Sequence, residues 1–478
     1  MAWEWRENNR EKVLEALRTG EYEAILTSRE GALDALAHLA WELGILDAVD
    51  LIRVERERGG IADDLLLRTL AVLPFVEAIG LSAAANTLFE DAAVLVKLGY
   101  TAVQIQKGFN DRRGAKQAEK SEQSLPYHPD VLRQELQRID LNSLNEFRKA
   151  CIRKLFAHKL VKGQIYTVDG SGIGDQMRVV GLLCLGKERP LWVNWRLRTG
   201  TESEKGKESS VVLEMIDELI EIQGSEVIEW LLVDALYADG PLLARLKYQY
   251  GIDVMVRLPE DRLMYQEMEQ KLSQSPTHWH EHTDVRYLSG HKQTRQMRVA
   301  AVHGLNNWDA YIEQAQAMGI ETPTLSVYAI ESDQVMPNGE TEKWALVATF
   351  PFTSAWKAYT HWRNRWTIEN NGFRELKEGW HLESGLWTFH NTAIAAARVT
   401  FTLLAYNVAQ IAKTHAGRNL TAKGIRTLRR QLTPRFGTNP IIVFTADAYA
   451  VLHLEELIQL LGGKPPKFSF WKSPANPL

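Results

Sequence analysis

Apolar residues follow a helical spacing near both ends of the chain and a strand-like spacing in its middle. Up to about residue 105, apolar residues recur every three or four positions, as in EKVLEALRTGEYEAILT and DDLLLRTLAVLPFVEAI, which predicts helices. The helical spacing resumes from Pro129 to His158 and again from Ala355 onward. Between these regions the apolar residues form short continuous runs, which favour buried strands.

The middle region predicts an alternation of strands and helices. QIYTVDGSG, RVVGLLCLG and PLWVNWRLR read as three strands, and QIYTVDGSG is expected to lead into a turn. A helix from Ser209 to Ile222, the strand EWLLVDALYADG, a helix from Pro241 to Gly251 and the strand IDVMVRLP follow. This order predicts an α/β fold, an RNase H-like mixed sheet with flanking helices.

The same patterns divide the chain into regions. Residues 262–345 contain four further strand candidates and predict a β-rich insertion into the core. We expect a helical N-terminal region at 1–106, a basic linker at 107–128, the core at 129–261 and 346–418, and a C-terminal helical region with its tail at 419–478.

Composition narrows the class of protein. The 478 residues are 45% apolar and 24% charged, which is ordinary for a globular protein, and Cys151 and Cys184 exclude a disulfide framework. The polar N-terminus lacks the apolar core of a signal peptide. The apolar run from Thr392 to Ile411 contains Arg398, so it predicts a buried core helix. We therefore expect a cytoplasmic protein without a membrane partner.

The net charge of −4 means that any DNA binding must depend on local basic patches. The polar segment from Lys107 to Gln123, which includes Arg112 and Arg113, is the candidate, and it predicts a flexible basic arm. The 15 Trp residues allow two interpretations, core packing or stacking on bases.

Two acids follow predicted strands. Asp169 comes after the run Ile165–Val168 and before Gly-Ser-Gly, and Asp234 comes after Trp230–Val233. Acids at the ends of neighbouring strands can present both carboxylates to one metal site, and hard cations such as Mg²⁺ need oxygen ligands. Each acid also has a structural interpretation, since Asp-Gly is a common turn and Asp234 could cap the following helix.

A third acid, Glu369, lies in a predicted helix. At about 100° per residue, Trp362, Arg365, Glu369 and Phe373 fall on one helix face. A carboxylate flanked by a cation and aromatic residues is unusual for the apolar face with which an amphipathic helix packs on a core. A solvated Arg–Glu pair would give the same spacing.

The alternating histidines His278, His280 and His282 are a possible metal motif. They lie in a polar part of the insertion, where a solvated strand is the more common arrangement. We therefore do not include them in the predicted site.

Two strand acids, a β-rich insertion and W-x2-R-x3-E on a helix together resemble bacterial insertion-sequence DDE transposases of the insertion-sequence-4 type. Their signature is Y-x2-R-x3-E-x6-K, and the resemblance covers roughly residues 129–412. It implies that Asp169, Asp234 and Glu369 are the catalytic acids and hold two Mg²⁺ or Mn²⁺ ions, as in two-metal cleavage of DNA.

The resemblance also implies partners. These are double-stranded DNA with the terminal inverted repeats of a transposon, target DNA, and a second copy of the chain once DNA is bound. Arg365, Trp362 and Lys377 would contact the DNA backbone at the transposon end, and the helical N-terminal region at 1–106 would be the DNA-binding region. Trp362 replaces the family's Tyr, and Lys377 is one residue later than the family's Lys. Either the helix is irregular after Gly372 or Lys377 has another role.

Two other functions remain open at this stage. A catalytically inactive DNA-binding relative would carry the same residues. A hydrolase that uses a carboxylate pair, as glycosidases do, would need no metal, so sensitivity to a chelator separates it from a transposase.

Overall fold

The computed structural model describes most of the chain. The described residues are 7–27, 31–56, 60–76, 80–101, 104–105, 108–109, 126–173, 177–186, 189–200, 208–274, 278–288, 291–305, 307–335, 339, 341–383, 391–416, 420, 422–436, 441–452, 457, 460 and 462. The chain divides into a first unit, Met1–Leu160 with Arg374–Leu478, and a second unit, Val161–Phe373. Arg112 and Arg113 lie outside the described residues.

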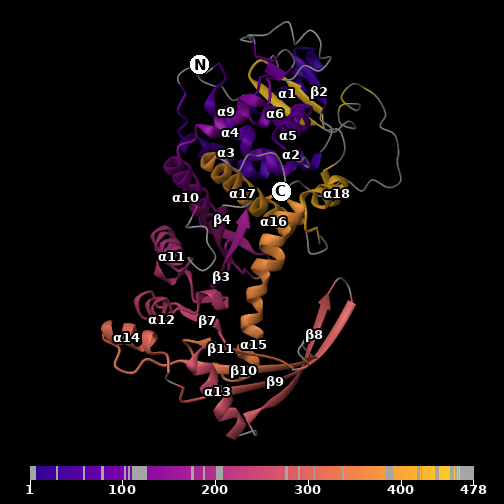
Figure 1. Ribbon diagram of the computed structural model, residues 1–478. Helices are drawn as coiled ribbons and strands as arrows, with labels where there is room; N and C mark the ends of the chain where they lie inside the picture. The colour runs from indigo at the N-terminus through magenta and orange to yellow at the C-terminus, as the bar shows by residue number, and fades with distance from the viewer. Residues whose placement is uncertain are drawn as a thin grey trace. The chain divides into compact units, whose positions relative to one another are not determined.

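The second unit is built on a mixed sheet with the described strand order β5-β4-β3-β6-β7-β11-β10-β9-β8 (Figure 1). Its strands are β3 (Ile165–Ile173), β4 (Met177–Cys184), β5 (Leu191–Thr199), β6 (Trp230–Val233), β7 (Asp253–Leu258), β8 (His280–Leu288), β9 (His291–Val302), β10 (Ser326–Val335) and β11 (Thr341–Ala348). β3, β6 and β7 are parallel to one another, and the other neighbouring pairs are antiparallel. The predicted mixed α/β core is therefore present.

Helical segments connect these strands in the predicted order. They are α11 (Ser209–Gln223), α12 (Gly240–Ala244), α13 (Leu263–Gln274), α14 (Asp309–Ala317) and α15 (Ala355–Trp362), with the 3₁₀ turns η4 (Ser225–Val227), η5 (Ala235–Tyr237) and η8 (Arg363–Arg365) and the π-helical turns η6 (Arg245–Gln249) and η9 (Ile368–Phe373). Among them, α11 lies between β5 and β6, and α12 lies between β6 and β7.

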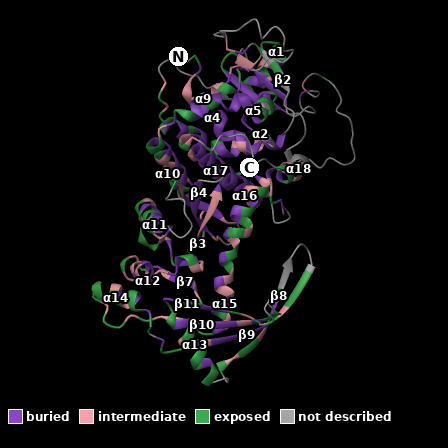
Figure 2. Ribbon diagram, viewed as in Figure 1, coloured by how far each residue is buried: buried purple, intermediate pink, exposed green. Residues whose placement is uncertain are grey.

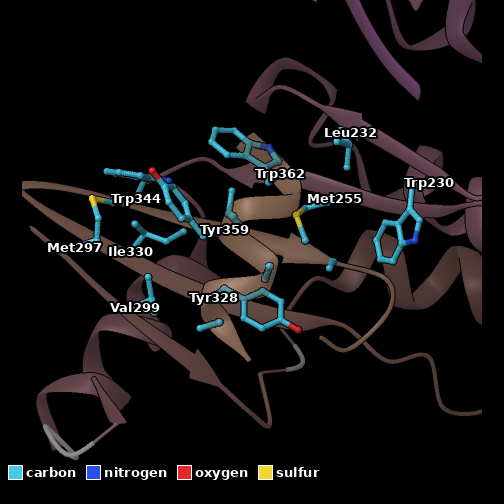
Figure 3. Close-up of a cluster of buried hydrophobic side chains, with 14 residues drawn as sticks. Trp230, Leu232, Met255, Met297, Val299, Tyr328, Ile330, Trp344, Tyr359 and Trp362 are labelled. Carbon is cyan, nitrogen blue, oxygen red and sulfur yellow. The ribbon is translucent and has the colours of Figure 1, made fainter. Parts of the chain in front are cut away.

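Helix α15 covers one face of this sheet. Its residues Ala355, Ala358, Tyr359 and Trp362 belong to a buried cluster with Met255 of β7, Tyr328 of β10 and Leu232 of β6 (Figure 3). Apolar residues in α15 recur every three or four positions and those in the strands recur every two, so each element presents one apolar face to the other. This packing fixes the helix that leads to Arg365 and Glu369.

The insertion is part of the same sheet. Its four strands occur where the sequence predicts them, and they extend the sheet beyond β7 through β11, β10, β9 and β8. The sequence did not predict its helices, α13 and α14. In β8, His280 is exposed, and the ring of His282 stacks on Trp356 with ring centroids 4.5 Å apart.

The first unit contains helices from both ends of the sequence. They are α1 (Arg10–Thr19), α2 (Gly31–Glu42), α3 (Ile45–Ala48), α4 (Asp63–Val72), α5 (Leu81–Phe89), α6 (Ala92–Lys97), α9 (Asp130–Gln137), α10 (Leu141–Ala157), α16 (Arg374–Gly379), α17 (Thr392–Ala416) and α18 (Ile425–Phe436), with the 3₁₀ turns η1 (Val49–Leu51) and η2 (Leu73–Phe75). Helix α17 packs against α2, α4, α9 and α10 and is mostly buried (Figure 2). By length and composition it could cross a membrane, but 83% of its apolar window is buried inside the unit, as the sequence predicts for a core helix.

A small sheet in the first unit corrects two predicted helices. β1 (Glu7–Asn8), β2 (Ala24–Thr27), β12 (Ile441–Phe444) and β13 (Ala448–Leu452) pair in the order β1-β13-β12-β2. The segments EYEAILT and AYAVLHLEELIQLLGG were expected to be helical, whereas AILT and AYAVL are strands. Their apolar residues fit either periodicity, and pairing between distant parts of the chain determines the outcome.

Candidate active site

Asp169 and Asp234 lie at the same level of neighbouring parallel strands. β3 and β6 pair with Ile165 opposite Trp230 and Thr167 opposite Leu232. Asp234 directly follows β6 and remains extended, with φ −83° and ψ 170°. Continuing this register places Asp169 opposite Asp234, on strands about 4.8 Å apart.

The two aspartates also share a face of the sheet. Side chains two positions apart in a strand point to the same face. Trp230 and Leu232 belong to the cluster that α15 covers, and Ile165 packs against that cluster. Asp169 and Asp234 lie an even number of positions farther along the same strands. Both carboxylates are therefore on the side of the sheet that carries α15.

The structure corrects two local interpretations. The sequence predicted a turn after Asp169, whereas β3 continues through Gly170 to Ile173 and Asp169 pairs with Gly181 of β4. Asp234 precedes the 3₁₀ turn Ala235–Tyr237, but among the described residues its side chain makes no capping hydrogen bond. The helix-cap interpretation of Asp234 is therefore wrong.

The carboxyl group of Asp169 is affected by the other acids. Burial raises its pKa to about 6, and the charges of Glu369 and Asp234 act in the same direction. Two groups oppose this rise: the backbone N–H of Gly170, which donates to Asp169 Oδ1 at 2.8 Å, and the charge of Arg365. Acids far apart in the sequence thus share one electrostatic environment in the fold.

Arg365 is bound to Glu369 inside the unit. Its Nη1 donates to Glu369 Oε1 at 2.6 Å, and its guanidinium lies over the ring of Trp362, 5.3 Å from the centroid. Arg365 is 4% exposed, whereas the side chain of Glu369 is 46% exposed. The sequence left open a solvent-exposed Arg–Glu pair. In the structure only the Glu369 carboxylate is exposed, and Arg365 is buried.

Glu369 lies in a π-helical turn, not in a regular α-helix. After α15, the chain forms the 3₁₀ turn Arg363–Arg365 and then the π-helical turn Ile368–Phe373. π-Helical turns inside helices are frequent at functional sites. The spacing of Lys377 raised the possibility of an irregular helix after Gly372, whereas the irregular turns end at Phe373 and a regular α-helix follows from Arg374.

Trp362 is part of the core. It is 3% exposed, and its indole Nε1 donates to the backbone oxygen of Val233, the residue before Asp234, at 3.4 Å. The sequence predicted that its ring would pack on DNA, but the ring lies inside the unit. The exposed aromatic residue next to Arg365 is Trp366, which is 39% exposed and which the sequence analysis did not single out.

Trp192 of β5 packs between the sheet and the π-helical turn. A Cβ at Gly181 of β4 would lie 2.4 Å from its Cζ3 atom, and a Cβ at Gly372 would lie 2.9 Å from its Cζ2 atom. The Trp192 ring also contacts Phe373, with ring centroids 4.9 Å apart. Both glycines allow this close approach, which places the Glu369 turn against the face that carries Asp169.

The opposite face of β3 carries a buried ion pair. Arg178 Nε lies 2.5 Å from Glu208 Oε1, and Arg178 Nη2 donates to the backbone oxygen of Gly170 at 2.8 Å. A Cβ at Gly170 would lie 2.7 Å from both groups. The glycine after Asp169 is therefore explained by this ion pair and not by a turn.

Lys377 lies in α16 of the first unit, where it forms an ion pair with Glu383. Arg112 and Arg113 belong to a segment outside the described residues, so their predicted role stays a prediction.

The donor chemistry of the three acids fits a divalent cation. Carboxylate oxygens are the ligands that Mg²⁺ and Mn²⁺ prefer. The charges of Glu369 and Asp234 raise the pKa of Asp169, and a bound cation would offset this repulsion. As their side chains stand, no three His, Cys, Asp or Glu residues in the described part of the chain form a metal-binding group. One oxygen of Glu369 is bound to Arg365.

No protein-family model matches this chain, and no curated protein matches its sequence.

Proposed function

We propose that this chain is a DDE-type transposase that cleaves DNA strands at transposon ends and joins them to target DNA. The observation that carries the proposal is the register of β3 and β6, which places Asp169 opposite Asp234, together with the charge of Glu369 acting on Asp169. Three carboxylates from a strand, a strand end and a helix, on one face of a sheet, are suited to binding two metal ions.

The topology supports an RNase H-like catalytic core. The strands β5-β4-β3-β6-β7 have the first three antiparallel and the last three parallel, with α11 between β5 and β6 and α12 between β6 and β7. In this arrangement β3, which contains Asp169, lies next to β6, and Asp234 directly follows β6. Acids on these two strands are therefore neighbours without any special loop.

Asp169, Asp234 and Glu369 would hold two Mg²⁺ or Mn²⁺ ions. When bound, the metals would activate water or a DNA 3′-hydroxyl and stabilise the leaving oxygen. The protein's contribution is positioning. The strands fix the backbone of the aspartates, and Trp192 holds the Glu369 turn against the sheet.

Arg365 has two roles in this proposal. In the free protein it pairs with Glu369 and limits the concentration of negative charge near Asp169. When DNA is bound, its guanidinium would grip a phosphate next to the scissile bond, because a planar fork binds phosphate oxygens bidentately. Among the described residues its Nε has no hydrogen-bond partner, but this atom is buried, so the phosphate contact requires the Arg365 side chain to move toward solvent.

The π-helical turn accounts for the spacing of Lys377. The interval from Glu369 to Lys377 is one residue longer than in the family signature. A π-helical hydrogen bond spans one residue more than an α-helical one, so the turn Ile368–Phe373 can take up the additional residue. This supports the assignment of Lys377 to the signature.

A second candidate function is a hydrolase with a carboxylate pair. It is favoured by the raised pKa of Asp169, about 6, because a carboxyl group that holds its proton closer to neutral pH can act as the acid of a carboxylate pair. Such an enzyme would work without metal.

The test is cleavage of plasmid DNA that carries the terminal inverted repeats flanking the coding sequence. We expect strand cleavage with Mg²⁺ or Mn²⁺, its loss on chelation, and its loss in Asp234→Asn with DNA binding retained. Asn replaces the charge with an amide of nearly equal volume, so the fold should survive. Full cleavage in a chelator or in Asp234→Asn, or none with either metal, would sink the proposal.

A further inference from the structure

One long stretch of the chain contains cations but no acids. Between Ser384 and Ala446 there are eight Lys and Arg residues and no Asp or Glu, and the nearest acids on either side are Glu383 and Asp447. The whole chain has a net charge of −4, so this excess is local. A concentration of one sign of charge raises the local concentration of oppositely charged partners.

Helix α18 presents part of this charge at the surface of the first unit. Lys423, Arg426 and Arg430 are exposed, and Arg426 and Arg430 are one turn apart on the helix, about 6 Å along its axis. Figure 2 colours part of α18 as exposed. The opposite side of the helix carries the fully buried residues Ile425, Leu428 and Leu432.

The start of α18 is held in place by close backbone packing. A Cβ at Gly424 would lie 2.9 Å from the Cα of Gly379, and the backbone oxygen of Gly424 accepts a hydrogen bond from Leu428 N at 3.0 Å. Partly buried Arg429 donates from Nη1 to the backbone oxygen of Phe75 at 3.4 Å. The cationic face is therefore presented by an anchored helix.

We propose that α18, with Lys423, Arg426 and Arg430, is a binding surface for the phosphate backbone of duplex DNA. This proposal rests on the proposed function, because it adds a DNA contact outside the three acids and the Arg365 helix. Lys423, just before the helix, and Arg426 and Arg430 on its exposed face can each contact a phosphate, and such contacts fix a protein on a duplex without reading its sequence.

The distribution of apolar residues favours DNA over an anionic membrane. A helix that lies in a membrane interface needs an exposed apolar face beside its cations. In α18 the apolar residues Ile425, Leu428 and Leu432 are buried in the unit, and the neighbour of Arg426 on the exposed side is Thr427. Over residues 425–432, the part of α18 whose side chains the structure describes, the surface therefore offers charge without an apolar face for lipid chains.

The test is the salt dependence of DNA binding by the full-length chain. The probe is a fluorescently labelled duplex of arbitrary sequence, titrated at several NaCl concentrations by anisotropy. Each phosphate contact contributes about 0.9 to the slope of log K against log salt. We expect Lys423→Ala/Arg430→Ala to lower the slope by about two and to weaken binding at every salt concentration.

Arg18→Ala/Arg133→Ala is the matched control, since it removes the same charge from the same unit. Both residues are exposed and pair with acids, Arg18 with Glu15 at 3.2 Å and Arg133 with Asp130 at 3.6 Å. We expect this control to keep the wild-type slope. Equal losses in both variants would overturn the proposal, because net charge alone would then account for the binding.

Two further outcomes would overturn the proposal. One is an unchanged slope in the α18 variant with an unchanged melting temperature. The other is wild-type protein that binds vesicles containing phosphatidylserine but not the duplex. Metal-dependent plasmid cleavage is measured separately. DNA binding through α18 without cleavage would contradict only the proposed function. Cleavage with an unchanged slope in the α18 variant would contradict only this inference.

Discussion

Arg365 donates to Glu369 at 2.6 Å in a helical turn packed on the face of the sheet that carries Asp169 and Asp234. A cation that is 4% exposed beside a carboxylate that is 46% exposed can neutralise one charge of an acidic site while leaving that carboxylate accessible. Arg365 therefore has a structural role within the fold, and its proposed role in binding DNA is a separate one that can be tested by itself.

Arg365→Ala tests these roles. Under the proposed function, the slope of log K against log salt should fall by about one, because one phosphate contact is lost. The free energy of unfolding should fall by about 1–2 kcal/mol, since Glu369 loses its charged hydrogen bond and Trp362 its cationic neighbour. DNA titrations across salt and denaturant unfolding measure the two effects. An unchanged slope with reduced stability would remove Arg365 from the DNA-binding residues.

Gly181→Ala should destabilise the second unit. The new Cβ would lie 2.4 Å from the buried Trp192 ring, and overpacking of this kind costs about 1–3 kcal/mol. Gly172→Ala is the control, because no atom lies within 4 Å of its Cβ position on the same sheet. Urea unfolding of both variants checks the prediction. The contact would be misassigned if Trp192→Phe, which supplies a smaller ring, failed to relieve the effect of Gly181→Ala.

Asp284→Asn should loosen the connection between strand β8 and the helix that leads to Arg365. Buried Asp284 accepts a hydrogen bond from Tyr359 Oη at 3.0 Å and forms an ion pair with Arg363, which begins the 3₁₀ turn. We expect a loss of about 1–3 kcal/mol in unfolding free energy, because Arg363 loses its charged partner. A double-mutant cycle with Arg363→Gln measures the pair, and purely additive losses would argue against the coupling.

Glu135 should make the stability of the first unit depend on pH. Its side chain is fully buried, Arg56 Nε lies 3.2 Å from its Oε2, and burial raises its pKa from 4.5 to about 7. A carboxyl group whose pKa is higher in the folded state stabilises the fold at low pH. This contribution is complete below about 4.5 and is lost as the pH rises through about 7.

Glu135→Gln should flatten this part of the pH profile, since the amide stays neutral. Chemical unfolding from below pH 4.5 to above pH 7 measures the effect, which should reach about 2–3 kcal/mol. Glu15→Gln changes an exposed carboxylate and should leave the profile unaltered. A Glu135→Gln profile parallel to that of the wild type would show that Glu135 does not titrate in this range.

The sequence predicted the core of the second unit because its signals are local. Continuous apolar runs identified the strand that contains Asp169 and the strand that ends before Asp234, and the helical spacing around Arg365 identified the segment that carries Glu369. The relation between the aspartates required more, because only strand pairing determines which residues lie opposite each other.

Other features depended on contacts between distant residues. Nothing near Gly181 or Gly372 indicates that both make room for Trp192, and the burial of Trp362 depends on a cluster drawn from several strands. The π-helical turn had one local signal, the additional residue before Lys377. That signal allowed two interpretations, an irregular helix or another role for Lys377, and the role of Lys377 stays a prediction.

The small sheet of the first unit has a consequence for synthesis of the protein on the ribosome. Glu7 of β1 pairs with Ala448 of β13, and Ile25 of β2 pairs with Val443 of β12. The N-terminal strands therefore lack their partners until residues 441–452 have been translated, whereas all strands of the second unit have been translated earlier. Premature termination before residue 441 would leave β2 without its neighbour β12, and an unpaired strand edge promotes aggregation.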